Sequence, residues 1–115
     1  MRAEKRIDYI EIPVTDIHKA REFFAALFDW TFEDWGEEYM SFNDGRLDGG
    51  FRLAKHVAPA NGVLVVFFST DIDRDFDRVQ ELGATISEPI FPFPGGRRFH
   101  FVDPTGTEYA IWSAA

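Results

Sequence analysis

The feature that most constrains the fold is an internal repeat. The segment Thr15-Asp16-Ile17 recurs as Thr70-Asp71-Ile72, and the surroundings of the two copies also correspond. Each copy follows an apolar run that is typical of a strand, Ile7–Val14 in the first half and Val63–Phe68 in the second. Self-similarity on this scale indicates one structural unit that is used twice.

Each copy also opens an amphipathic helix, because apolar residues recur at the three-to-four spacing of one helical face. They are Ile17, Ala20, Phe24, Leu27 and Phe28 in the first helix and Ile72, Phe76, Val79 and Leu82 in the second. Thr15 or Asp16, and Thr70 or Asp71, are the candidates to cap the two helix starts. Gly83 is the candidate to end the second helix.

Three strands are expected after each helix. They are Trp30–Phe32, Glu38–Phe42 and Gly49–Leu53 in the first half, and Thr85–Ile90, Arg97–Val102 and Glu108–Trp112 in the second. Asn43–Gly45 and Asp103–Gly106 carry turn-forming residues between the last two strands of each half. Each half is therefore predicted to be a βαβββ module.

The chain length of 115 residues suits one domain. Module one is predicted over about 6–53, a linker over 54–62 and module two over about 63–113. One module alone buries its helix and sheet poorly, so we expect an α+β fold in which both modules form a curved mixed sheet. The sheet would surround a cup, with the helices on its outer face, and a cup is where a small molecule binds.

The amino-acid composition limits the classes of ligand and partner that this chain can bind. With 20 acidic and 12 basic residues the net charge is −8, which disfavours nucleic acid and favours a cationic ligand. Because there is no cysteine, disulfides and thiolate chemistry are excluded. We find no signal-like or membrane-length apolar stretch and expect a cytoplasmic protein. The 13 phenylalanines exceed what a small core buries, which favours an apolar cavity or a homodimer interface.

Several stretches resemble the vicinal oxygen chelate superfamily, which includes glyoxalase I, extradiol dioxygenases, fosfomycin-resistance enzymes and bleomycin-resistance proteins. They are residues 10–17, 20–24, 27–30, 98–106 and 111–112. The resemblance runs from about residue 6 to 113 and is nearest to small bacterial glyoxalase-like proteins. It implies the fold described above, whereas the function stays open because this scaffold hosts lyases, dioxygenases and pure binding proteins.

The resemblance also implies where a metal would be held. Metal-dependent relatives place four ligands, usually His and Glu, on the cup face of four strands. The corresponding positions here are Tyr9, Phe51 or Arg52, Val63 or Leu64, and Ala110. Since these are not the ligands that divalent metals prefer, we predict no usual metal site and no cofactor. That prediction disfavours glyoxalase I chemistry, in which the metal stabilises an enediolate.

Two carboxylates are candidate catalytic groups. Strand alternation places Tyr9 and Glu11 on the cup side of the first strand, and Glu108, Ala110 and Trp112 on the cup side of the last. A carboxylate in an apolar cup can act as a general base. The alternative is that Glu11 and Glu108 are solvated rim residues or ion-pair partners of Arg52 or Arg98.

Other residues are candidates for ligand binding. Tyr39 and Arg52 offer hydrogen bonds, and Arg52 also offers a partner for a ligand carboxylate. Trp112 is a stacking platform or a core residue, and His100 lies in a strand between two phenylalanines. Phe93 belongs to the segment Phe91–Gly96, which is either an aromatic lid at the cavity mouth or an edge that shields the core.

Three functions follow from these residues. The first is a metal-independent protein that binds a small aromatic or cationic drug or metabolite. The second is a glyoxalase-type lyase, isomerase or dioxygenase that uses a displaced metal or a glutamate base such as Glu11 or Glu108. The third is a non-catalytic module whose role is dimer formation.

Overall fold

The computed structural model describes residues 4–57 and 63–114. The chain divides into an N-terminal unit, Met1–Val57, and a C-terminal unit, Ala58–Ala115. Of the predicted linker 54–62, residues 58–62 lie outside the described residues.

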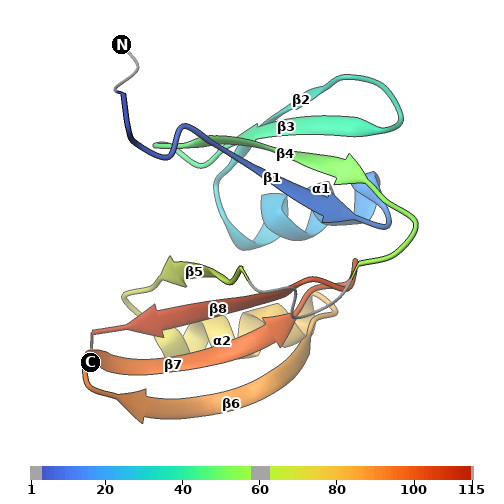
Figure 1. Ribbon diagram of the computed structural model, residues 1–115. Helices are drawn as coiled ribbons and strands as arrows, with labels where there is room; N and C mark the ends of the chain where they lie inside the picture. Colours follow the sequence, from blue (N-terminus) through green and yellow to red (C-terminus); the bar gives the residue numbers. More distant parts are fainter. Residues whose placement is uncertain (1–3, 58–62, 115) are drawn as a thin grey trace. The chain divides into compact units, whose positions relative to one another are not determined.

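The N-terminal unit has one helix on one face of a mixed sheet (Figure 1). Its elements are β1 (Tyr9–Val14), α1 (Ile17–Leu27), β2 (Thr31–Asp34), β3 (Tyr39–Asn43) and β4 (Asp48–Leu53). The strand order is β1-β4-β3-β2, with β1 parallel to β4 and the other pairs antiparallel. The parallel pair requires the helical crossover that α1 provides.

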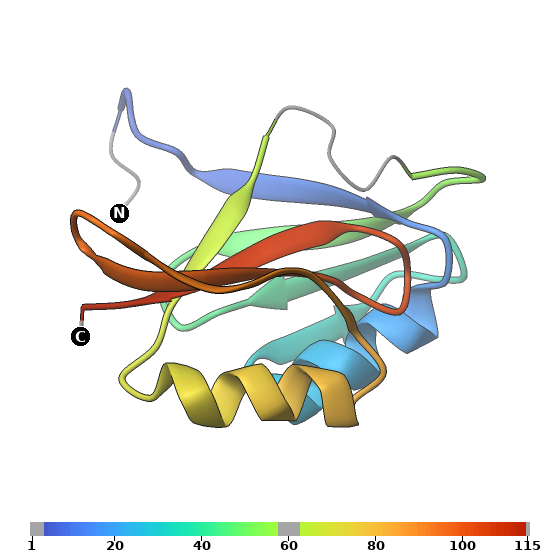
Figure 2. The same ribbon diagram turned by 90° about the horizontal axis from the view of Figure 1, so that it is seen from below.

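The C-terminal unit repeats this arrangement (Figure 2). Its elements are β5 (Val65–Phe68), α2 (Ile72–Glu81), β6 (Thr85–Phe93), β7 (Gly96–Val102) and β8 (Glu108–Ser113). The strand order β5-β8-β7-β6 matches that of the first unit, with β5 parallel to β8. The α+β class and the two βαβββ modules are therefore confirmed.

Strand pairing differs from the expectation of one shared sheet. The hydrogen-bonded pairs among the described strands stay within a unit, which gives two four-stranded sheets. Each sheet is completed by its own parallel β–α–β crossover.

Both helices start as the repeat predicts. The side chain of Asp16 accepts a hydrogen bond from the backbone N–H of Lys19, and Asp71 accepts one from Arg74. Aspartate rather than threonine is thus the cap in each copy. Gly83 follows Leu82, the C-cap of α2, and has a φ of 98°, a left-handed conformation that glycine adopts without strain.

The core of each unit lies between its helix and its sheet. In the N-terminal unit Phe24 of α1 stacks on Phe51 of β4 and on Trp30, with ring centroids 5.6 and 4.9 Å apart. In the C-terminal unit Phe76 of α2 meets Phe99 of β7 edge to face at 5.2 Å. These contacts show that the apolar face of each sheet is the one covered by the helix, so the opposite face is the one on which a ligand can bind.

No helix among the described residues is long and apolar enough to cross a membrane.

Candidate functional site

The N-terminal sheet presents a polar face opposite α1, which we call the N-face. Strand register brings Glu11, Gly50, Ser41 and Glu33 into one row across β1, β4, β3 and β2. A second row holds Tyr9, Asp48, Asn43 and Thr31. The side chains of a row point to the same side because strand residues alternate.

The centre of the N-face is hollow because its central residue has no side chain. A Cβ at Gly50 would come within 2.1 Å of the Tyr39 hydroxyl oxygen and 2.6 Å of the Tyr9 hydroxyl oxygen. The two tyrosines therefore lean over the space that any other residue at position 50 would fill. Position 50 is a glycine because a side chain would fill the hollow, and not because the backbone there needs the conformational freedom of glycine.

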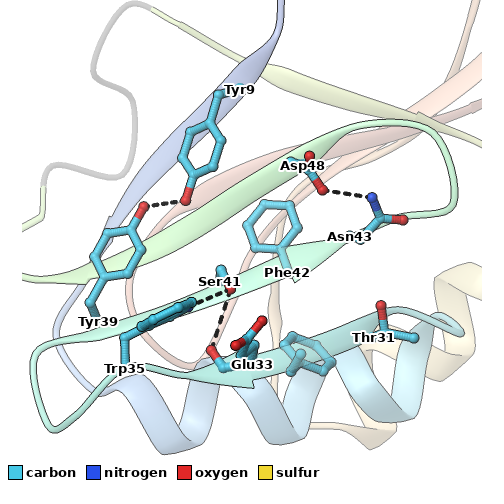
Figure 3. A pocket seen from close by; sticks show the side chains of 10 residues that line it. Tyr9, Thr31, Glu33, Trp35, Tyr39, Ser41, Phe42, Asn43 and Asp48 are labelled. Carbon is cyan, nitrogen blue, oxygen red and sulfur yellow. Dashed lines mark hydrogen bonds between the residues drawn. The ribbon is translucent and has the colours of Figure 1, made fainter. Parts of the chain in front are cut away.

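A pocket of about 490 Å³ occupies this hollow (Figure 3). Its lining is Tyr9, Thr31, Phe32, Glu33, Trp35, Tyr39, Ser41, Phe42, Asn43 and Asp48. Five of these ten residues are aromatic, two are acidic, and there is no lysine or arginine among them. The volume suits a small organic molecule, and the side chains suit one that is aromatic or positively charged.

Hydrogen bonds hold the polar side chains of the pocket in place. The indole N–H of Trp35 donates to the Ser41 hydroxyl at 2.9 Å, and the Asn43 amide donates to Asp48 at 2.8 Å. Figure 3 shows the hydroxyls of Tyr9 and Tyr39 pointing at each other, and they form a hydrogen bond. Trp35 is 62% exposed, so its ring is available to a ligand.

One network joins four of the residues that the sequence marked as site candidates. Tyr39 bonds Tyr9, and Glu11 accepts a hydrogen bond from the Arg52 guanidinium at 3.1 Å. Burial raises the pKa of Tyr39 well above the usual value of a phenol, and hydrogen bonds with Tyr9 and Glu11 raise it further. Tyr39 is therefore a neutral hydrogen-bonding group at physiological pH.

The C-terminal sheet has an equivalent face opposite α2, which we call the C-face. Here Glu108, His100 and Arg98 form a chain of contacts. The Nδ1 atom of His100 lies 3.2 Å from a carboxylate oxygen of Glu108, which also accepts a hydrogen bond from Ser87 at 3.0 Å. Arg98 donates through Nε and Nη2 to the other ring nitrogen of His100, at 3.2 and 3.0 Å.

These contacts define the tautomer of His100. A guanidinium has no acceptor, so Nε2 must be the accepting nitrogen. The proton of the neutral ring then sits on Nδ1 and points at Glu108.

Aromatic rings surround this chain on the C-face. The Arg98 guanidinium carbon lies 5.9 Å from the ring centre of Phe91 and 5.8 Å from that of Phe93. Trp112 packs edge to face with Phe93 at 6.1 Å and with Phe68 at 5.0 Å. The segment Phe91–Gly96 is thus the end of edge strand β6 and the turn into β7, and its rings pack over Arg98 and Trp112.

The family model for the glyoxalase/bleomycin resistance protein/dioxygenase superfamily matches residues 6–111. The chain belongs to this superfamily. Solved structures share the fold of this chain at low sequence identity, as three examples illustrate. No curated protein sequence matches the chain.

The fosfomycin resistance protein FosX of Listeria monocytogenes, solved with manganese(II) and sulfate, has a TM-score of 0.83 and 16% identity. The match covers 98% of this chain and 93% of that one. TioX from Micromonospora sp. ML1 has a TM-score of 0.70 and 21% identity over 94% and 98% of the two chains. A superfamily enzyme of Burkholderia phytofirmans PsJN has a TM-score of 0.79 and 14% identity over 94% and 98%.

The positions that correspond to superfamily metal ligands do not fit a divalent metal. Phe51 is fully buried in the core, so the second position is Arg52, a cation already bonded to Glu11. Neither Val63 nor Leu64 has a side-chain donor atom, the same holds for Ala110, and Tyr9 is bonded to Tyr39. Among the described residues, no three His, Asp or Glu side chains come together as a metal site would require.

The structure groups the predicted site residues by unit. Tyr9, Glu11, Tyr39 and Arg52 share the N-face, while Phe93, His100, Glu108 and Trp112 share the C-face. Glu11 forms an ion pair with Arg52, whose side chain is 51% exposed. This ion pair is the alternative that the sequence offered to a catalytic role for Glu11. Glu108 pairs with His100 instead of Arg98.

Most of the pocket lining escaped the sequence reasoning. Trp35 and Glu33 line the pocket, although no motif in the sequence marks them as site residues. The alternation of β2, extended by one position, places Glu33 and Trp35 on the same side. The positions of Asp48 and Ser41 in the pocket depend on the register between β3 and β4, which cannot be predicted from a single sequence.

Proposed function

We propose that this chain binds a small aromatic cation in the N-face pocket without the usual metal of the superfamily. The observation that carries the proposal is the lining itself, with aromatic walls, two carboxylates and no basic side chain. Cations bind to the faces of aromatic rings, and a nearby carboxylate strengthens the attraction. The net charge of −8 acts in the same direction.

The roles of the lining residues follow from their contacts. Trp35 is the stacking surface, because its ring is exposed while its N–H is fixed by Ser41. Glu33 and Asp48 supply negative charge at two edges of the pocket. Tyr39 and Tyr9 close a third edge through their shared hydrogen bond.

Calorimetric titration with benzyltrimethylammonium tests the proposal, with benzyl alcohol as a neutral aromatic of similar size. We expect saturable binding of the cation, and binding of the alcohol weaker by about tenfold. Trp35→Ala is expected to weaken cation binding by about tenfold, since a cation–π contact contributes about 1–2 kcal/mol. Equal binding of both probes would contradict the proposed role of charge.

A matched pair of variants on β2 isolates the carboxylate. Glu33→Gln removes a charge that lines the pocket, while Asp34→Asn removes one from the next residue, which faces away and keeps its bond to the Gly36 N–H. We expect about fivefold weaker binding for Glu33→Gln and less than about twofold for Asp34→Asn. Similar effects of the two changes would show that only the overall charge matters.

The second candidate function is enzymatic, and the observation that favours it is the His100–Glu108 pair. A histidine held in one tautomer by a carboxylate is the arrangement of a general base. A displaced metal is the other route to glyoxalase-type lyase, isomerase or dioxygenase chemistry. Elemental analysis of the purified protein discriminates: stoichiometric zinc, nickel, iron or manganese would favour this candidate over metal-free binding.

A homodimer is the proposed assembly. The edge strand β5 carries Val66 and Phe68 with 41% and 57% of their surface exposed, and an exposed apolar edge favours association. Light scattering at micromolar concentration is expected to give twice the chain mass. A monomer would remove this part of the proposal without affecting the pocket.

A further inference from the structure

Arg98 combines partial burial with the lack of an acidic partner among the described residues. Arg52, Arg74, Arg78 and Arg97 each form an ion pair with an acidic side chain. Arg98 is half-buried, yet within the described residues its hydrogen-bond partner is the neutral ring of His100. A partly buried cation without a counter-ion is costly in a chain that has 20 acidic residues to offer.

The orientation of the Arg98 guanidinium is fixed by its neighbours. Phe91 and Phe93 pack their rings against it, and His100 accepts from Nε and Nη2. The N–H groups of Nη1 have no acceptor among the described residues. A guanidinium with fixed orientation and free N–H groups matches the planar, two-oxygen geometry of a carboxylate.

The surroundings of Arg98 select among anions. Glu108 carries a negative charge one histidine away, so the C-face suits a single negative charge better than a phosphate dianion. The rings of Phe91, Phe93 and Trp112 suit an apolar, planar body beside that charge.

We propose that the C-face is a binding site for small aromatic carboxylates, with Arg98 as the residue that recognises the carboxylate group. His100 holds the guanidinium in the free protein, and Glu108 and Ser87 hold His100. The residues that form this site all belong to the C-terminal unit, and the ligand has the opposite charge, so the proposal is tested independently of the function proposed for the N-face pocket.

Calorimetric titration with benzoate is the test, with benzamide as the neutral analogue of the same shape. We expect saturable binding of benzoate and at least about tenfold weaker binding of benzamide, because the charge-assisted bonds are lost. Equal affinities, or no saturable heat with benzoate up to about 10 mM, a limit that corresponds to a very weak site, would overturn the proposal.

Arg97 provides a matched control on the same strand. It lies next to Arg98 on the opposite face of β7 and pairs with Asp73 at 3.4 Å. Arg98→Gln is expected to weaken benzoate binding at least about tenfold and Arg98→Lys less, because lysine keeps the charge but not the fork of donors. Arg97→Gln is expected to change it less than about twofold. Equal effects of Arg97→Gln and Arg98→Gln would refute a site at Arg98.

NMR of the histidine ring adds a readout that a merely structural role of Arg98 would not give. In the free protein the Nδ1 of His100 carries the proton and Nε2 accepts from Arg98. Benzoate is expected to shift the Nε2 signal of His100, since it binds the guanidinium that donates to this nitrogen. Benzyltrimethylammonium titrated into Arg98→Gln separates the two proposals, because binding at the N-face should survive this change.

Discussion

The N-face and the C-face are built on the same strand order but are filled differently. The central position of the N-face is Gly50, next to Ser41 and Glu11, whereas the equivalent position of the C-face is Ala110, next to His100 and Val66. The N-face is hollow, acidic and aromatic, and its arginine is neutralised by Glu11. The C-face is occupied by the Ser87–Glu108–His100–Arg98 chain, which leaves one guanidinium without a carboxylate.

This difference shows which positions of the repeated module are constrained by folding and which are not. The helix sides of both sheets keep apolar residues such as Phe51 and Phe99, because each unit must bury its own core. The opposite faces are free of that requirement, so their charges diverge. Substitutions at paired positions in the two units test this divergence.

The hairpin turns of the two units give the largest contrast in stability. Asp103 is 3% exposed and accepts bonds from the N–H groups of Thr105 and Thr107 and from the Thr105 hydroxyl, whereas Asp44 is exposed and accepts from two N–H groups. Asp103→Ala is expected to lower the free energy of unfolding by about 3 kcal/mol, because buried donors are left unpaired. Asp44→Ala should cost about 1 kcal/mol or less. Urea denaturation measures both, and equal losses would contradict the contrast in burial.

The central small residues test whether the hollow is the binding site. Gly50→Ala is expected to weaken benzyltrimethylammonium binding more than about tenfold, since Tyr9 and Tyr39 must move. The added atom should lower the free energy of unfolding by about 1–2 kcal/mol. Ala110→Gly is the mirror change in the other unit and should cost about 1 kcal/mol with unchanged cation binding. Unaltered cation binding in Gly50→Ala would rule out this pocket.

Alkaline pH tests the tyrosine network of the N-face. Burial raises the pKa of Tyr39, and the pKa of Tyr109 in the other unit is raised by burial and by the charge of Asp103. A raised pKa means that the folded state holds the proton more tightly than the unfolded chain. The resulting stabilisation is present below the usual phenol value of about 10 and is lost as pH rises through the folded-state value.

Absorbance at the phenolate band measures this effect directly. We expect native protein to ionise two of its three tyrosines later than urea-unfolded protein. Tyr39→Phe should remove one of the two late steps and reduce the loss of stability at alkaline pH by less than about 1 kcal/mol, because Tyr39 is only partly shielded from water. An unchanged titration curve in Tyr39→Phe would show that Tyr39 ionises normally.

Two serines give the smallest expected contrast. Ser41 accepts from Trp35 on the N-face, and Ser87 donates to Glu108 on the C-face. Each change to alanine should cost about 0.5–1.5 kcal/mol in unfolding free energy. Ser41→Ala should also shift Trp35 fluorescence, while Ser87→Ala should not. An unchanged emission spectrum in Ser41→Ala would contradict the bond between Ser41 and Trp35.

The sequence alone was sufficient to predict the modules. The repeated Thr-Asp-Ile segment and the spacing of residues such as Phe24 and Val79 depend on local periodicity, which a single chain displays. The turn at Asp103–Gly106 was predicted from its turn-forming residues. The structure agrees, because Gly106 takes a left-handed φ of 96°.

The pocket was harder to predict because it depends on register. Alternation predicts Tyr9 on the binding side, and Tyr39 and Arg52 are candidates because of their hydrogen-bonding groups. Asp48 and Ser41 join them through the pairing of strands, which depends on register. Gly50 lies within the strand that the sequence predicts, but its effect on the hollow depends on its position between Tyr9 and Tyr39. The contacts of Arg98 with His100 could not be predicted from the sequence, because they depend on the conformations of the two side chains.

The most direct test of the account is a two-ligand NMR titration of the intact chain. We predict that benzyltrimethylammonium shifts the Trp35 indole and the amides of Tyr39 and Ser41, while benzoate shifts the side-chain signals of Arg98 and His100. Each ligand should leave the other set unchanged. If both ligands shifted the same residues, the claim that two equivalent sheet faces have acquired opposite charge preferences would be wrong.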